Sequence, residues 1–87
     1  MLKLQISKDA RKFLDNLSPK QFRQIIRKVF SLLEDPRPND TKELQGFPFL
    51  RSDAGEYMVI YDIQGDMLRL ILVGKRNDDE VYKKMKG

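Results

Sequence analysis

Tyr82 stands among basic residues near the carboxyl end of this 87-residue chain; its basic neighbours are Lys75, Arg76, Lys83 and Lys84. An isolated tyrosine has a pKa of about 10, and nearby cations favour its ionised form, so a tyrosine in a cationic cluster can exchange a proton with a substrate. The chain has no histidine, the usual acid or base near neutral pH. Catalysis would therefore depend on Tyr82 and on cations. The alternative interpretation is structural, with the Tyr82 ring packed on a sheet and solubilising neighbours.

Cations and a tyrosine are suited to the cleavage of RNA without a metal. In that reaction the 2′-hydroxyl attacks the neighbouring phosphate, which requires a proton acceptor, a proton donor and positive charge near the phosphoryl oxygens. The absence of cysteine excludes thiolate ligands, a cysteine nucleophile and disulfides. Asp78-Asp79-Glu80 favours helix capping over metal binding, because consecutive helical side chains point about 100° apart. We expect no metal and no cofactor.

The positive charge of the chain is uneven. Seventeen basic and thirteen acidic residues give a net charge of +4, and the first 33 residues hold eight of the basic residues but only two of the acidic ones. Such a distribution is typical of a protein that binds a polyanion or an acidic partner, although a merely solvated basic surface remains the alternative. Arg23 and Arg27, on one flank of a predicted helix, are candidates for RNA contacts.

A strand and two amphipathic helices are expected in the first half. Leu2, Leu4 and Ile6 alternate with polar residues, as in a strand. Ser7 can cap a helix over 8–17, and Ser18-Pro19 can begin a second helix, because proline is favoured at the first helical position. The second helix carries an apolar stripe that should pack on the sheet. Its residues are Phe22, Ile25, Ile26, Val29 and Leu33, and the expected sheet partners are Leu68, Leu70 and Leu72.

The second half predicts an antiparallel meander. Asp35-Pro36 ends the long helix, since proline disfavours helical backbone before it, and a turn is expected at 42–46. Extended segments follow at 49–54, 56–63 and 67–73. Gly74 should break the last strand, and Asn77 or Asp78 should cap a short helix. The predicted fold class is α+β in the order β-α-α-β-β-β-α, a helical hairpin on a small, largely antiparallel sheet, with a short C-terminal helix.

Length and hydropathy indicate one domain over residues 1–87, because a second core would need more chain. The amino terminus lacks the continuous apolar stretch of a signal peptide, and no apolar run approaches membrane-spanning length. With no cysteine present, the cytoplasm is the expected compartment and no membrane partner is expected.

Four segments resemble the RelE/ParE toxin superfamily, in its RelE-like branch. They are Asp35-Pro36-Arg37-Pro38, Lys42-x-Leu44-x-Gly46, Gly55-Glu56-Tyr57-Met58-Val59-Ile60-Tyr61 and the carboxy-terminal run from Gly74 to Tyr82. The resemblance spans almost the whole chain, and the joint order of the segments is more specific than any one of them. It implies a toxin of a toxin–antitoxin pair, an acidic cognate antitoxin, and an endoribonuclease that cleaves messenger RNA on the ribosome.

The same resemblance implies roles for individual residues. Arg76 would stabilise phosphate charge, Tyr82 would stack on a base or transfer a proton, and Arg51 would occupy a basic substrate-binding position. Lys42 and Lys75 are further RNA-binding candidates. We expect Arg51, Arg76 and Tyr82 to share one concave surface near Met58.

Met58 departs from the family pattern Gly-x-Tyr-Arg-Val-Ile-Tyr, because it stands where a catalytic arginine is usual. A thioether cannot hold a phosphate, so this altered position favours a second hypothesis, a non-enzymatic protein binder. Such a binder would be either a ParE-like gyrase inhibitor or an inactive RelE-like domain that still binds its antitoxin. If Met58 is the missing catalytic position, restoring arginine there should accelerate RNA cleavage.

Overall fold

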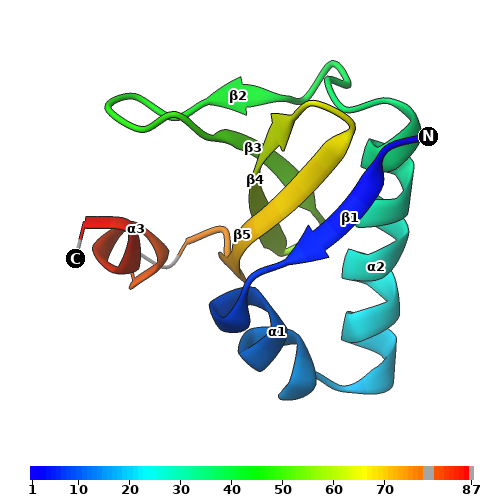
Figure 1. Cartoon of the computed structure of the whole chain (residues 1–87). Helices are drawn as coiled ribbons and strands as arrows, with labels where there is room; N and C mark the ends of the chain where they lie inside the picture. Colours follow the sequence, from blue (N-terminus) through cyan, green and yellow to red (C-terminus); the bar gives the residue numbers. More distant parts are fainter. Residues whose placement is uncertain (78–79, 87) are drawn as a thin grey trace.

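A mixed five-stranded sheet forms the centre of the molecule, with helices α1 and α2 on one face and the short helix α3 on the other (Figure 1). The computed structural model describes residues 1–77 and 80–86. The elements are β1 (Lys3–Ile6), α1 (Lys8–Asp15), α2 (Pro19–Glu34), β2 (Lys42–Glu43), β3 (Leu50–Ala54), β4 (Tyr57–Gln64), β5 (Met67–Lys75) and α3 (Glu80–Lys86). The predicted α+β class is confirmed. No helix in the described segments combines the length and apolar character needed to cross a membrane.

The strand order across the sheet is β1-β5-β4-β3-β2. Strands β3, β4 and β5 pair antiparallel, which confirms the predicted meander, and β1 joins β5 in parallel. Strand β2 was not expected: the predicted turn at 42–46 begins with two residues that pair with β3, Lys42 opposite Arg51 and Glu43 opposite Leu50. Two residues are too few to show an alternating pattern in the sequence.

Serine residues begin both long helices, as predicted. The Ser7 side chain accepts a hydrogen bond from the Ala10 backbone N–H, at 3.0 Å. Ser18 and Gln21 form a reciprocal capping box at the start of α2, with Pro19 in the first turn. These contacts satisfy backbone donors that a helix leaves unpaired at its amino end.

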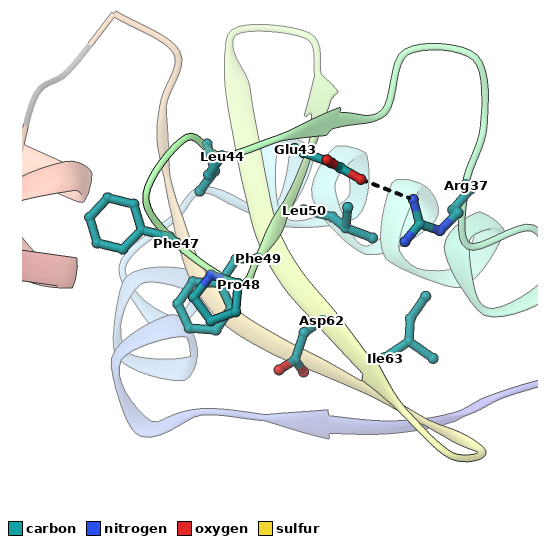
Figure 2. A pocket seen from close by; sticks show the side chains of 9 residues that line it. All are labelled: Arg37, Glu43, Leu44, Phe47, Pro48, Phe49, Leu50, Asp62 and Ile63. Carbon is teal, nitrogen blue, oxygen red and sulfur yellow. Dashed lines mark ion pairs between the residues drawn. The ribbon is translucent and has the colours of Figure 1, made fainter.

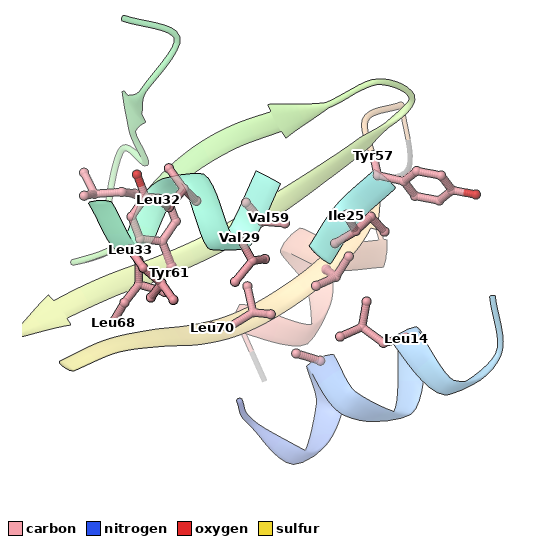
Figure 3. Packing of buried hydrophobic residues seen from close by; sticks show 13 residues of the cluster. Leu14, Ile25, Val29, Leu32, Leu33, Tyr57, Val59, Tyr61, Leu68 and Leu70 are labelled. Carbon is pink, nitrogen blue, oxygen red and sulfur yellow. The ribbon is translucent and has the colours of Figure 1, made fainter. Parts of the chain in front are cut away.

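The main core lies between the helices and the sheet (Figure 3). Helix α2 contributes Ile25, Val29, Leu32 and Leu33, and the sheet contributes Tyr57, Val59, Tyr61, Leu68 and Leu70. Most of the predicted stripe is therefore confirmed. Phe22 is an exception, since 42% of it is exposed. Side chains three residues apart on a helix differ in direction by about 60° around the helix axis. Phe22 therefore lies to one side of the buried row formed by Ile25 and Val29.

Leu72 was expected beside Leu68 and Leu70, and that expectation is wrong. The register of β4 and β5 shifts, so that Ile60 pairs with Leu72 while Tyr61 pairs with Leu70, and Ile71 is the extra residue of a β-bulge. One extra residue reverses which side chains face the helices. Leu72 consequently joins a second cluster under α3, and Val73 takes its place in the main core.

Gly74 lies within β5 and does not break the strand. A Cβ at this position would lie 2.0 Å from Val81 Cγ2. The missing side chain therefore permits α3 to dock closely on the sheet, and Val81 is buried there with Met58, Ile60 and Leu72. Of the predicted caps of α3, Asp78 lies outside the described residues.

Candidate functional site

Arg51 and Tyr82, from β3 and α3, meet on the sheet face that α3 covers. Arg51 Nη1 donates a hydrogen bond to Tyr82 Oη at 2.7 Å. Tyr82 Oη also lies 4.0 Å from Met58 Sδ, a distance at which a hydroxyl forms only a weak hydrogen bond with sulfur. Part of the Tyr82 side chain packs on the second apolar cluster. The two interpretations of Tyr82 are thus compatible, because the ring packs on the sheet while the oxygen meets a cation.

Asp53 links Arg51 to Arg76. Arg51 Nε donates to Asp53 Oδ1 at 3.1 Å, and Arg76 Nε lies 3.4 Å from Asp53 Oδ2. The structure therefore brings together Arg51, Arg76 and Tyr82, the three residues that were expected to share one surface near Met58. Asp53 was not among the predicted site residues. Its spacing from Arg51 was a usable indication, because residues two apart on a strand share a face.

Arg76 follows β5 directly and is held by the turn between β3 and β4. Its backbone N–H donates to Glu56 O at 2.9 Å, and its Nη1 donates to Gly55 O at 3.3 Å. Gly55 has a φ of 63°, a conformation that glycine adopts without strain. Half of the Arg76 side chain is exposed, so its guanidinium can reach a ligand in solvent.

Arg51 is more enclosed, with 17% of its side chain exposed. Burial acts to lower the pKa of Arg51, but the hydrogen bond to Asp53 and the charge of that carboxylate outweigh burial, so the pKa is raised above its ordinary value. Arg51 therefore remains a permanent cation within this cluster.

Met58 is completely buried on the same face of the sheet. It pairs directly with Asp53 across β3 and β4, and Val81 of α3 packs in the same cluster. The altered position thus lies within the arginine cluster but beneath α3, and the residue there is apolar.

Lys42 and Lys75 differ in their relation to this cluster. Lys42 is exposed and lies directly opposite Arg51, on the same face of the sheet. Lys75 is also exposed but pairs with Tyr57, whose ring belongs to the helix-side core. The register therefore places Lys75 on the opposite face from Arg51.

Arg23 and Arg27 do not join the arginine cluster. They are exposed on α2 and line a shallow hollow with Lys20 and Gln24. A neighbouring hollow shares Lys20 and Gln24 with it and extends to Gly55, Glu56 and Arg76. The two hollows form a continuous surface from α2 to Arg76.

A separate hollow of about 330 Å³ lies at the other end of β3 (Figure 2). Its lining includes Phe47, Pro48 and Phe49, and Arg37 Nη1 lies 3.8 Å from Glu43 Oε1 across its rim. Asp62 in this lining is already hydrogen-bonded to Arg69 Nε, at 2.7 Å. None of the predicted site residues lines this hollow.

No group of three or more potential ligand side chains is arranged to hold a metal ion in the segments 1–77 and 80–86. Asp78 and Asp79, for which capping was preferred over metal binding, lie outside those segments. The chemistry of the described cluster is that of two guanidinium groups, a phenol and a carboxylate.

Comparison with known proteins identifies the family. The family model described as the ParE toxin of the type II toxin–antitoxin system parDE matches residues 4–80, so the chain belongs to this family of toxins. The resemblance to the RelE/ParE superfamily is thereby confirmed. A comparison with curated protein sequences gave no match.

Solved structures of RelE toxins share the fold. The isolated Escherichia coli RelE toxin is 25% identical, with 99% of this chain and 96% of that chain covered and a TM-score of 0.75. The toxin of the intact E. coli RelBE toxin–antitoxin complex is 24% identical, with 90% and 100% covered and a TM-score of 0.73. The archaeal RelE–RelB complex from Pyrococcus horikoshii OT3 gives 23% identity, 87% and 96% coverage and a TM-score of 0.75. The fold is that of the RelE-like branch.

Proposed function

We propose that this toxin cleaves messenger RNA in the ribosomal decoding site, without a metal, by attack of the 2′-hydroxyl on the adjacent phosphorus. The observation that supports this function best is the 2.7 Å contact between Arg51 Nη1 and Tyr82 Oη. This contact combines a permanent cation with a proton donor on one surface. The proposed target places the protein in the cytoplasm.

Each side chain has a distinct role in the proposed reaction. As the 2′-oxygen bonds to phosphorus, it loses its proton to water, and Arg76 stabilises charge on the phosphoryl oxygens. The bond to the 5′-oxygen breaks, and Tyr82 gives its proton to that leaving oxygen. Arg51 stabilises the phenolate that remains until it is reprotonated by solvent. The products are a 2′,3′-cyclic phosphate and a 5′-hydroxyl.

Cleavage on programmed ribosomes tests this proposal. Purified toxin is added to ribosomes that carry a defined message, and cleavage is mapped by primer extension. We expect cuts in the decoding site, and Arg76→Ala should slow them about a hundredfold, the usual effect of removing one preorganised donor. Lys83→Ala is the control, because Lys83 is exposed next to Tyr82 and contributes charge without joining the cluster. An intact message after incubation with the parent protein would overturn the proposal.

An antitoxin is the second proposed partner. The E. coli RelBE and P. horikoshii RelE–RelB structures are toxin–antitoxin complexes, and by analogy this chain binds an acidic cognate antitoxin. The basic amino-terminal third of the chain supplies the complementary charge.

A non-enzymatic protein binder is the competing proposal, and Met58 and Asp53 favour it. An apolar residue occupies the usual arginine position, and a carboxylate compensates the two arginines that remain. A ParE-like gyrase inhibitor would suppress DNA supercoiling by gyrase while leaving ribosome-bound message intact. An inactive RelE-like domain would do neither and would still bind the antitoxin.

A further inference from the structure

We propose that the Asp53 carboxylate is an internal anion that occupies the position of a substrate phosphate between Arg51 and Arg76, and that RNA binds by displacing it. This inference rests on the proposed RNA substrate. It makes Asp53 a residue that sets the affinity of the site for anions.

The geometry of the carboxylate matches that of a bound phosphodiester. Oδ1 accepts from Arg51 Nε at 3.1 Å, and Oδ2 lies 3.4 Å from Arg76 Nε. One group thus places two oxygens on two guanidinium groups, as the two non-bridging oxygens of a phosphate do.

Both arginines have other partners that hold them when the carboxylate leaves. Arg51 Nη1 is hydrogen-bonded to Tyr82 Oη, and Arg76 Nη1 is hydrogen-bonded to Gly55 O. The binding position therefore persists without Asp53. A phosphate would enter a site whose cations are already oriented.

Solvent reaches part of the carboxylate, whereas the backbone of Asp53 is held within β3. The Asp53 backbone N–H donates to Asp40 Oδ2 at 3.3 Å, and on its other side Asp53 pairs with Met58 of β4. The Asp53 side chain is 22% exposed, and that of Arg76 is 50% exposed. The pair with Arg76 is the one that solvent reaches, and such pairs contribute little, so a polyanion can compete for Arg76. The pair with Arg51, whose side chain is 17% exposed, is the more enclosed of the two.

A purely structural role for Asp53 predicts the opposite effect of mutation. If Asp53 only positions the arginines, its removal should weaken RNA binding. If it competes with the phosphate, Asp53→Asn should strengthen binding, because the amide has a similar shape but no charge.

The experiment measures binding of a short, fluorescently labelled single-stranded oligoribonucleotide whose 2′-hydroxyls are methylated to prevent cleavage. We expect Asp53→Asn to bind about tenfold more tightly than the parent protein. Asp66→Asn is the matched control, because it removes the same charge from an exposed carboxylate that lies 3.5 Å from Lys3 Nζ, away from the cluster. Its affinity should change less than about twofold, since exposed charges are screened at physiological salt. Inorganic phosphate should compete better against the probe on Asp53→Asn than on the parent.

Each result bears separately on the two proposals. Tighter binding by Asp53→Asn alone supports the internal anion, whether or not ribosomes programmed with message are cut. Unchanged or weaker binding by Asp53→Asn overturns it, even if the parent protein cleaves message. Equal tightening by Asp66→Asn also overturns it, because net charge would then explain the gain. No binding by any variant overturns the inference and removes support for an RNA substrate.

Discussion

Met58 is the residue on which the proposed activity depends most, because it stands where the family pattern has an arginine. It is fully buried, pairs with Asp53 across the strands and touches the cluster that α3 covers. An arginine there would bring a charge beneath α3, with the Asp53 carboxylate as its direct neighbour. The residue therefore influences both stability and the charge available to a substrate.

We expect Met58→Arg to accelerate ribosome-dependent cleavage and to lower stability. The new guanidinium would compete for Asp53 and release Arg76 for the substrate, a gain of up to about a hundredfold in rate. Insertion of a charge beneath α3 should cost about 2 kcal/mol of unfolding free energy. Primer extension on ribosome-bound message and chemical denaturation measure the two effects.

Met58→Leu is the control for Met58→Arg, because it keeps the position apolar and should change neither quantity appreciably. A Met58→Arg protein that folds, binds ribosomes and cuts no faster than its parent would show that position 58 is not the missing catalytic position. The assignment of the site would then have to be redrawn.

Helix α3 packs on the sheet through Val81, Tyr82 and Met85, and Val81 makes the closest approach, at Gly74. Gly74 leaves space for Val81, and Tyr82 reaches Arg51 only because α3 lies against β5. The position of the Tyr82 phenol is therefore coupled to the packing of an element seven residues long.

Gly74→Ala should loosen α3 and reduce cleavage. Its Cβ would lie 2.0 Å from Val81 Cγ2, an overpacking that should destabilise the protein by about 1–2 kcal/mol. Faster amide hydrogen exchange in α3 would report the loosening. Adding Val81→Ala to Gly74→Ala should restore protection, because the smaller side chain relieves the clash. Unchanged exchange in the single variant would contradict this account.

The loop between α2 and β2 is anchored by Asp40. Asp40 Oδ2 accepts from Ser52 Oγ at 3.0 Å, and Lys28 Nζ lies 3.1 Å from the same oxygen. Burial acts to raise the pKa of Asp40, but the hydrogen bonds from Lys28, Ser52 and the Asp53 N–H outweigh it, so the pKa is lowered below 3.8. These contacts also fix the strand that carries Arg51 and Asp53.

A lowered pKa implies acid sensitivity. The Asp40 carboxylate stabilises the fold above the pKa of the unfolded chain, and this stabilisation is lost as pH falls through the lower pKa of the folded state. We expect Asp40→Asn to lower Tm at neutral pH and to make Tm less dependent on pH between about pH 5 and pH 2. Thermal melts of the parent and the variant across this pH range test the expectation. A Tm difference that stays the same at every pH would refute it.

On the scale of the whole molecule, charge is segregated along the chain. The first 33 residues contain eight basic and two acidic side chains, and Lys20, Arg23 and Arg27 are exposed on α2. Together with Arg76, which lies on the surface that continues from α2, they form a basic region that complements an acidic partner in charge.

Antitoxin binding should accordingly weaken with salt. We expect an acidic antitoxin to lay a helix or strand across this region, covering Arg76 or displacing α3. Its affinity should fall about tenfold or more between low and high ionic strength. The double variant Arg23→Ala/Arg27→Ala should show a shallower dependence. An affinity that is the same at both ionic strengths would argue against recognition led by charge.

Patterns local in the sequence predicted the elements well. Alternation and helical spacing, together with the serines at Ser7 and Ser18, gave the order of helices and strands because each depends on near neighbours. The predictions for Phe22 and Leu72 were wrong for another reason. How far a side chain is buried, and which face of the sheet it lies on, depend on residues that are distant in the sequence. The contact of Asp53 with Arg76 has the same origin, because Arg76 reaches it only after the sheet has formed, whereas the spacing of Asp53 from Arg51 is local.

The β-bulge at Ile71 changes which residues of β5 are equivalent to one another in facing. Ser7 holds the bulge in place, since its N–H donates to Leu70 O at 2.9 Å and its hydroxyl donates to Ile71 O at 2.5 Å. Before Ile71 the even-numbered side chains, Leu68 and Leu70, face helices α1 and α2, whereas after it the odd-numbered Val73 does. Deleting Ile71 would restore the regular alternation of β5, with Leu72 still facing α3 and Val73 still paired with Val59 in the main core. An alignment of relatives that places a gap elsewhere in β5 would equate inward-facing residues with outward-facing ones.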